Sequence, residues 1–207
     1  MAGRPQHDAA STEDPDVNGR ILEAFAGVVT ERGYAATTVE DIARRAHVPI
    51  SVVYERFSGL DGCFVAFYRA TTAYIVEHVT GVVRAQAEAG FDWRVHTREG
   101  TRAYLASLAA QPALAQLAHL EIEAVGAAGR QARRETTDAF ARAIEHLTAQ
   151  GAREGFGVRA LDFHTALALV SAAHGLVLRH IEVVGAERLV ELTTPVSDVI
   201  ITLLEAR

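Results

Sequence analysis

The chain has 207 residues, 49% of them hydrophobic, which is enough for a sizeable core, and its formal net charge is −6. This charge argues against nonspecific attraction to nucleic acid over the whole surface, although one local face can still be basic. The single cysteine, Cys63, excludes an internal disulfide and favours a reducing cytoplasm. All 20 basic residues counted as Lys or Arg are arginine, the side chain suited to bidentate phosphate and guanine contacts.

No targeting or membrane segment is expected. The first five residues lack the basic and apolar signature of a secretory signal. The most apolar stretch, 166–178, is interrupted by Ser171 and His174 and is too short to span a membrane. We therefore expect a cytoplasmic protein with no membrane partner.

The N-terminal part begins with an acidic, apolar-poor segment at 1–16, which predicts a disordered tail. From Val17 apolar residues recur at spacings of three and four, which predicts an amphipathic helix ending near Arg32 and Gly33. Thr38 and Asp41 form a pattern like a capping box and predict the start of a second, short helix.

A turn follows at Pro49, which cannot lie inside a helix and biases Val48 toward an extended backbone. The next segment, 50–57, predicts a third helix with Val53 and Phe57 facing the core. Three helices in about forty residues, the last two joined by a tight turn, indicate a helix-turn-helix.

The rest of the chain is predicted to be helical without strands. A long helix is expected over about 60–87, and further helices near 94–110, 113–126, 131–152, 162–184 and 195–206. We therefore expect an all-α fold of three parts: a tail at 1–16, a helix-turn-helix domain at 17–60, and a helical ligand-binding and dimerisation domain at 61–207.

Residues 33–57 resemble the DNA-binding signature of the tetracycline-repressor (TetR) family. The matching elements are Gly33-Tyr34, Thr37-Thr38, Ile42-Ala43, Ala46, Val48 and above all Tyr54 with Phe57. With the preceding helix the resemblance covers about fifty residues, and the remainder matches only in length and helical layout. It implies a non-enzymatic transcriptional regulator that forms an Ω-shaped homodimer on a palindromic operator in double-stranded DNA.

The resemblance also implies the DNA contacts. Phosphate contacts are expected from the helix-start threonines and the tyrosine, and base contacts from the exposed positions of the third helix. Arg44 and Arg45, on the outer side of the second helix, could add screening. The full predicted set is Thr37, Thr38, Arg44, Arg45, Ile50, Ser51, Val52, Tyr54, Glu55 and Arg56. Hydroxyls and amides at a helix N-terminus suit phosphate anchoring, because the helix dipole favours an anion there.

Three departures from the family pattern change the expected binding. His47 stands where the family usually has glycine, at a helix end that often needs a left-handed backbone. Pro49 replaces a side-chain cap, and Leu60 replaces a familiar lysine. Residues 17–57 hold five arginines and five acidic residues, so the domain is neutral and modest nonspecific affinity is expected. Readout should depend on apolar contacts of Ile50 and Val52 with thymine methyls.

The last two predicted helices, near 162–184 and 195–206, are apolar over most of their circumference. Such helices must be buried on several sides, and a terminal helix usually achieves this only against a partner chain. We expect a four-helix dimer interface here, with an ordinary intrachain core as the alternative.

Candidate effector contacts lie between the fourth and eighth predicted helices. An apolar site with a few polar groups would suit a drug-sized, largely apolar molecule. The candidates are Tyr74, His78, Trp93, Tyr104, His119, Glu123, Phe140 and His174, each of which could instead serve packing or the surface. His119 and Glu123, one helical turn apart, could orient a polar ligand group or form a surface pair.

Enzyme and metal alternatives lack a matching pattern. None of the nine histidines follows a glutamate by three residues, no two histidines are spaced by four, and no glycine-rich phosphate loop occurs. We expect no catalytic residue, metal or cofactor. The function expected is a repressor released from DNA by a small effector, with activation open; the alternatives are a protein-interaction module with a degenerate helix-turn-helix, or a metal-binding helical enzyme.

Overall fold

The computed structural model describes residues 16–86 and 92–205, the backbone alone at 84–86. The described residues form helices without a strand, and one isolated antiparallel bridge joins Val158 to Glu205. The predicted all-α fold is confirmed. Residues 1–15 of the predicted tail at 1–16 lie outside the described residues, and the predicted domain limits stay predictions.

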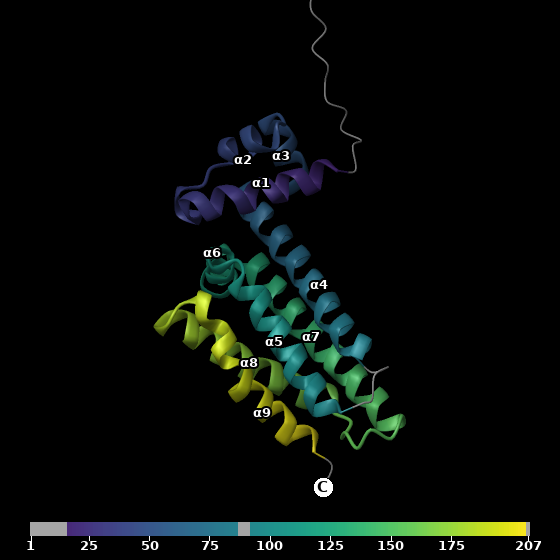
Figure 1. The fold of residues 1–207 in the computed structure, drawn as a ribbon. Helices are drawn as coiled ribbons and strands as arrows, with labels where there is room; N and C mark the ends of the chain where they lie inside the picture. The colour runs from purple at the N-terminus through teal and green to yellow at the C-terminus, as the bar shows by residue number, and fades with distance from the viewer. Residues whose placement is uncertain (1–15, 87–91, 206–207) are drawn as a thin grey trace, which may run out of the picture. The chain divides into compact units, whose positions relative to one another are not determined.

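Contacts divide the chain into two compact units, one ending at Phe67 and one starting at Tyr68. The helices of the first unit are α1 (Val17–Arg32), the short 3-10 helix η1 (Tyr34–Ala36), α2 (Val39–Ala46), α3 (Ile50–Phe57) and the first turns of α4 (Leu60–Gln86) (Figure 1). All four α-helices begin within a residue of their predicted positions.

The core of the first unit is aromatic. Phe25 of α1 stacks on Phe64 of α4 with ring centroids 6.0 Å apart, and Tyr34 lies 5.1 Å from Phe64. Ile42 of α2 and Val53 of α3 are fully buried. Each helix therefore contributes at least one apolar side chain to one core, which fixes α3 on its Val53 side.

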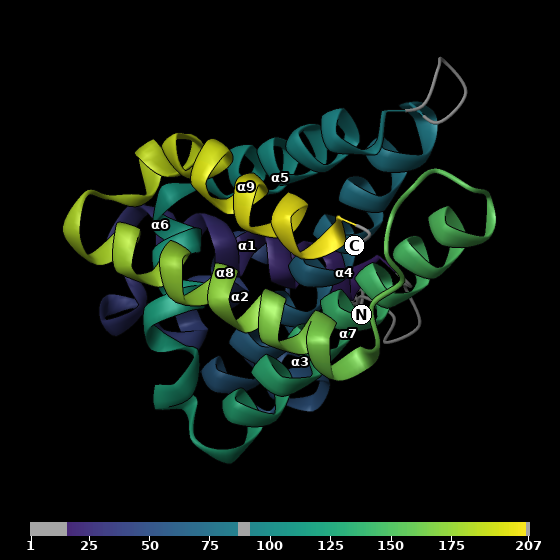
Figure 2. The same ribbon diagram turned by 90° about the horizontal axis from the view of Figure 1, so that it is seen from below.

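The second unit continues α4 and adds a bundle of helices. These are α5 (Trp93–Ala109), α6 (Pro112–Gln116), the π-helix η2 (Leu117–Glu121), the 3-10 helix η3 (Ile122–Val125), α7 (Ala127–Arg153), α8 (Phe163–Val183), the 3-10 helix η4 (Ala186–Leu192) and α9 (Thr193–Leu204). Seen from below, α8 and α9 lie side by side (Figure 2).

Two apolar clusters hold this unit together. One joins Leu105 and Leu108 of α5 to Val177 of α8 and Leu189 of η4. The other joins Trp93 to residues of α7, α8 and α9, including Ala141, Leu169 and Ile201. Because each cluster takes residues from helices far apart in sequence, the bundle depends on tertiary packing rather than on local helix propensity.

The predicted single helix at 113–126 is wrong. The chain there is broken into α6, η2 and η3. The carbonyl of Ala115 accepts a hydrogen bond from the His119 ring nitrogen Nδ1 at 2.9 Å, and such side-chain insertion interrupts a regular helix. Gly126, with φ of 78°, ends η3, and α7 begins directly afterwards instead of at 131.

Candidate nucleic-acid interface

The start of α2 is capped as predicted. The Asp41 amide donates to the Thr38 hydroxyl oxygen at 3.2 Å, and the Thr38 hydroxyl donates to Asp41 Oδ2 at 2.8 Å. An N-cap of this kind stabilises a helix by about 1 kcal/mol. The Thr38 side chain is exposed and therefore stands at the surface beside the first turn of α2.

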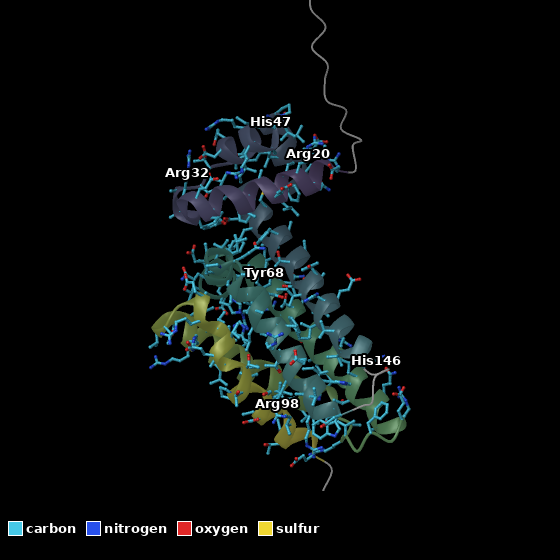
Figure 3. The ribbon with its side chains drawn as sticks, in the orientation of Figure 1. Arg20, Arg32, His47, Tyr68, Arg98 and His146 are labelled. Carbon is cyan, nitrogen blue, oxygen red and sulfur yellow. The ribbon has the colours of Figure 1, made fainter. Side chains whose placement is uncertain are left out.

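Asp41 also ties α2 to α1. Its Oδ1 accepts from Arg32 at 3.2 Å and from Arg44 at 3.0 Å, and Arg32 lies at the end of α1 (Figure 3). The hydrogen bond from Thr38, with the nearby arginine charges, lowers the pKa of Asp41. A second pair joins Arg45 to Glu31 at 2.6 Å. The predicted DNA-contacting residues Arg44 and Arg45 are thus already paired with carboxylates inside the unit.

The turn between α2 and α3 has the backbone that the sequence predicts. His47 lies between α2 and α3 (Figure 3). Its backbone is left-handed, with φ of 56° and ψ of 44°, and the Val48 amide donates to the Ala43 carbonyl at 3.0 Å. Pro49 precedes α3 in an extended conformation and supplies no side-chain cap. A non-glycine residue at positive φ carries some strain, which the hydrogen-bonded turn offsets.

The recognition candidate, α3, has one inward and one outward side. On the inward side, Val53 is buried and Phe57 is half-buried. Val52, on another flank of the helix, is also half-buried. The exposed side chains are Ile50, Ser51, Tyr54, Glu55 and Arg56. Six of the ten predicted DNA-contacting residues therefore belong to one short helix, and five of those six are exposed.

Thr37 differs from the other predicted contacts. It is buried, its hydroxyl donates to the Gly33 carbonyl at 2.8 Å, and its amide donates to the Tyr34 carbonyl at 3.0 Å. These bonds make Thr37 a part of the turn between α1 and α2, because both of its hydrogen-bond donors are used there.

One supporting contact was missed from the sequence. The Tyr34 hydroxyl donates to Asp61 Oδ1 at 2.6 Å and so ties the α1–α2 connection to the first turn of α4. The Tyr34 and Asp61 positions are 27 residues apart, and neither helical spacing nor a cap pattern connects them.

In the second unit the predicted effector residues separate into different places. Tyr104 and Phe140 are in edge contact at 5.6 Å and pack on the cluster of Leu105 and Val177. Burial raises the pKa of Tyr104. Tyr68, which the sequence did not single out, is buried, and its pKa is raised by burial against an opposing hydrogen bond with Thr136.

His119 of η2 and His174 of α8 stack with ring centroids 5.1 Å apart. Burial, with His174 beside it, lowers the pKa of His119 to about 4, and burial likewise lowers the pKa of His174. Glu123 does not pair with His119: its Oε1 lies 2.7 Å from Arg133 Nε as an ion pair, without an aligned N–H···O hydrogen bond. Both imidazoles are therefore neutral near pH 7.

The other three predicted effector residues lie elsewhere. Tyr74 and His78 stack on an exposed side of α4. Trp93 is buried in the cluster with Ala141 and Leu169, as the first residue of α5 rather than a loop residue. Among the residues that the structure describes, no group of three or more His, Cys, Asp or Glu is placed to hold a metal ion.

Within the described residues, α8 and α9 leave four large apolar side chains exposed. Leu176 and Val183 of α8 and Val199 and Leu203 of α9 are exposed. By length and composition α8 could also span a membrane, and 22% of its apolar window is buried inside the chain. One helix of that kind is weak evidence for a membrane span, because helices covered by protein have the same composition.

Comparison with known proteins agrees with this geometry. Residues 21–67 match the model of the bacterial regulatory proteins of the TetR family. None of the curated proteins matches the chain. A TetR-family regulator from Mesorhizobium loti has a similar structure, with a TM-score of 0.74 and 17% identity over 95% of this chain and 100% of that one.

Two regulators named FadR are also similar in structure. FadR from Bacillus subtilis, solved with stearoyl-CoA, gives a TM-score of 0.70 at 17% identity, covering 90% of this chain and 99% of that one. FadR from Bacillus halodurans gives 0.67 at 19% identity, covering 90% and 95%. The TetR-family regulators are non-enzymatic transcription factors. Residues 21–67 match the DNA-binding domain of the TetR family, and the fold of nearly the whole chain is the one found in solved TetR-family transcriptional regulators.

Proposed function

We propose that this protein is a dimeric, cytoplasmic repressor that binds a palindromic operator and is released from it by a small, largely apolar effector. The observation that carries the proposal is the outward side of α3. The side chains on this side are exposed, and α3 follows a capped α2 and a hydrogen-bonded turn. Regulators of the TetR family, whose DNA-binding domain this unit matches, bind DNA.

In the proposed complex Thr38 and Tyr54 contact phosphates, and Ile50, Ser51 and Val52 face the base edges. A hydroxyl at a helix start and a phenol at the surface are suitable phosphate donors. Arg44 and Arg45 have carboxylate partners in the free protein, so each must exchange a partner to reach a phosphate. We expect this exchange to keep nonspecific affinity modest.

The dimer is proposed to form through α8 and α9. Their exposed large apolar side chains are Leu176, Val183, Val199 and Leu203, and exposed apolar side chains that gather on one surface mark an interface. Two-fold symmetry places the same side of each chain in contact. A dimer of this kind requires a palindromic operator whose half-sites match the spacing of the two α3 helices.

The effector is proposed to bind near the Tyr104–Phe140 contact and the His119–His174 stack. Tyr104, His119, Phe140 and His174 are half-buried and keep some accessible surface, which suits an apolar ligand with a few polar contacts. The similar FadR of B. subtilis was solved with stearoyl-CoA, a ligand with a long apolar chain. Glu123, Tyr74, His78 and Trp93 remain weaker candidates.

Effector and DNA are proposed to be coupled through α4, which starts in the first unit and continues in the second. A ligand lowers operator affinity only by its differential affinity for the two arrangements of the dimer. If an effector that binds the protein left operator affinity unchanged, the coupling would be wrong.

A mobility-shift assay with the DNA upstream of the protein's own gene tests the proposal. Tyr54→Phe should weaken binding to every DNA sequence by a similar factor, because a phosphate contact carries no base information. Tyr74→Phe is a matched control, since Tyr54 and Tyr74 are 52% and 65% exposed. Absence of any shift would favour the protein-interaction alternative, and a reporter gene would separate repression from activation.

A further inference from the structure

Glu55 lies at the centre of the outward side of α3. Successive residues of an α-helix are rotated by about 100°, so a residue two positions away lies about 160° around the helix. Glu55 is two positions after Val53 and two before Phe57, the buried and half-buried residues that face the core. No other residue of α3 stands opposite to both of them, and Ser51 lies one turn earlier on the same side.

The carboxylate of Glu55 is exposed, and the ion pairs described for this unit do not include it. Arg32 and Arg44 pair with Asp41, and Arg45 pairs with Glu31. A negative charge at this position repels phosphates, so Glu55 reduces affinity for DNA in general. Its position on a DNA-facing side therefore suggests a gain in specificity that compensates for the loss of affinity.

A carboxylate only accepts hydrogen bonds, and the major groove offers donors at cytosine N4 and adenine N6. Guanine O6 and N7 and thymine O4 are acceptors, which a carboxylate repels. Adenine places the acceptor N7 beside its donor, whereas the cytosine base presents its N4 donor without a neighbouring acceptor. Cytosine is thus the base that suits a carboxylate best.

The geometry points to Glu55 as a specificity-determining residue that selects a cytosine in each half-site, its carboxylate accepting a hydrogen bond from cytosine N4. This inference rests on the proposed function, because it requires the outward side of α3 to enter the major groove. Ile50 is five positions before Glu55 and lies about 140° from it around the helix, so the cytosine contact of Glu55 does not involve Ile50.

Selection from a pool of random-sequence duplexes tests the inference with three full-length proteins: wild type, Glu55→Gln and Glu23→Gln. Glu23 is an exposed glutamate of α1, so its substitution removes the same charge from the same unit. Wild type and Glu23→Gln should enrich one two-fold symmetric sequence with a cytosine at matching positions of both half-sites. Glu55→Gln should keep the rest of that sequence and lose the cytosine, with a shift toward adenine, which glutamine binds at N6 and N7.

Binding curves on the selected site and on a site with both cytosines replaced give the size of the effect. Wild type should prefer the cytosine site by roughly tenfold for each base contact, or about a hundredfold for the two replaced cytosines, and Glu55→Gln should not. Thermal unfolding of each variant verifies that it is folded.

Two results would overturn the inference in different ways. If Glu55→Gln binds all DNA more tightly and keeps the wild-type base preference, Glu55 acts only by repelling phosphates, and the proposed function stands. If wild type enriches no sequence at all, the proposed function fails together with the inference.

Discussion

A Cβ atom on Gly62 would lie 1.4 Å from the carbonyl oxygen of Phe57. The backbone of the first turn of α4 therefore touches the backbone at the end of α3, and no side chain fits between them. Ser58, with φ of 60°, makes the sharp connection between the two helices. This contact, together with the buried Val53, determines which side of α3 faces outward.

Gly62→Ala should therefore displace α3 and destabilise the first unit. The new Cβ would overlap a backbone atom, so the clash can be removed only if one of the two helices moves. Overpacking of this kind costs about 2 kcal/mol of stability. Operator affinity should fall as well. Gly81→Ala is the matched control on the same helix, since a Cβ there would meet nothing within 4 Å apart from its chain neighbours and the backbone of its own helix. That variant should gain about 0.5–1 kcal/mol, the usual effect of replacing a helical glycine.

Chemical unfolding monitored by circular dichroism measures both changes. If Gly62→Ala is as stable as wild type and binds DNA equally well, the contact between α3 and α4 does not determine the orientation of α3.

The buried imidazole of His119 should make stability depend on pH. Its pKa is lowered from 6.5 to about 4 in the folded protein, so the unfolded chain binds a proton more readily. The contribution of the neutral His119 to the free energy of unfolding is complete above pH 6.5 and is lost as the pH falls toward 4. At pH 5 the loss for this one group is about 2 kcal/mol, at about 1.4 kcal/mol for each pKa unit.

Unfolding free energies of wild type and His119→Gln at pH 7.5 and pH 5 give the measurement. The glutamine variant lacks this titration, so its stability should fall less between the two pH values, by about 2 kcal/mol. Equal losses for the two proteins would mean that His119 is accessible to water and protons in the folded state.

The apolar side of α8 and α9 predicts the effect of introducing a charge. Leu176→Arg and Val199→Arg, at side chains 41% and 45% exposed, should each convert a dimer to a monomer, because an unpaired guanidinium would be buried at the interface. Tyr74→Arg, on exposed α4, should leave the dimer intact. Light scattering coupled to size-exclusion chromatography gives the mass.

If the wild-type protein is a monomer in solution, the proposed dimer is wrong. If the wild-type protein is recovered only with vesicles or detergent, lipid covers α8 instead of a second chain.

The first unit was the part that the sequence predicted best. The start of α2 is encoded by Thr38 and Asp41, and the turn by Pro49, all of them local signals that act within four residues. The same reasoning failed at 113–126, because a helical pattern does not show that the His119 side chain takes the carbonyl of Ala115. The Asp162 cap of α8, which accepts from the Thr165 amide at 2.9 Å, carried a local signal that was overlooked.

The sensor part of the site was predicted less well. The eight effector candidates share only their residue types. The structure distributes seven of them between the His119–His174 stack, the Tyr104–Phe140 contact, the surface of α4 and the Trp93 cluster, and it pairs Glu123 with Arg133. Pairings such as Glu123 with Arg133 join separate helices, and spacing within one helix does not encode them.

The most direct test of the central claim uses a photocrosslinker on the outward side of α3. Cys63 is the only cysteine, it is buried, and burial raises the pKa of its thiol to about 12, so it should not react with a thiol reagent. Ser51→Cys and, as a control, Glu23→Cys each supply one exposed thiol for an aryl azide. Position 51 should crosslink to bases in both half-sites of bound operator, and position 23 should give few crosslinks. Binding without crosslinks from position 51, or equal crosslinking from both positions, would contradict the central claim.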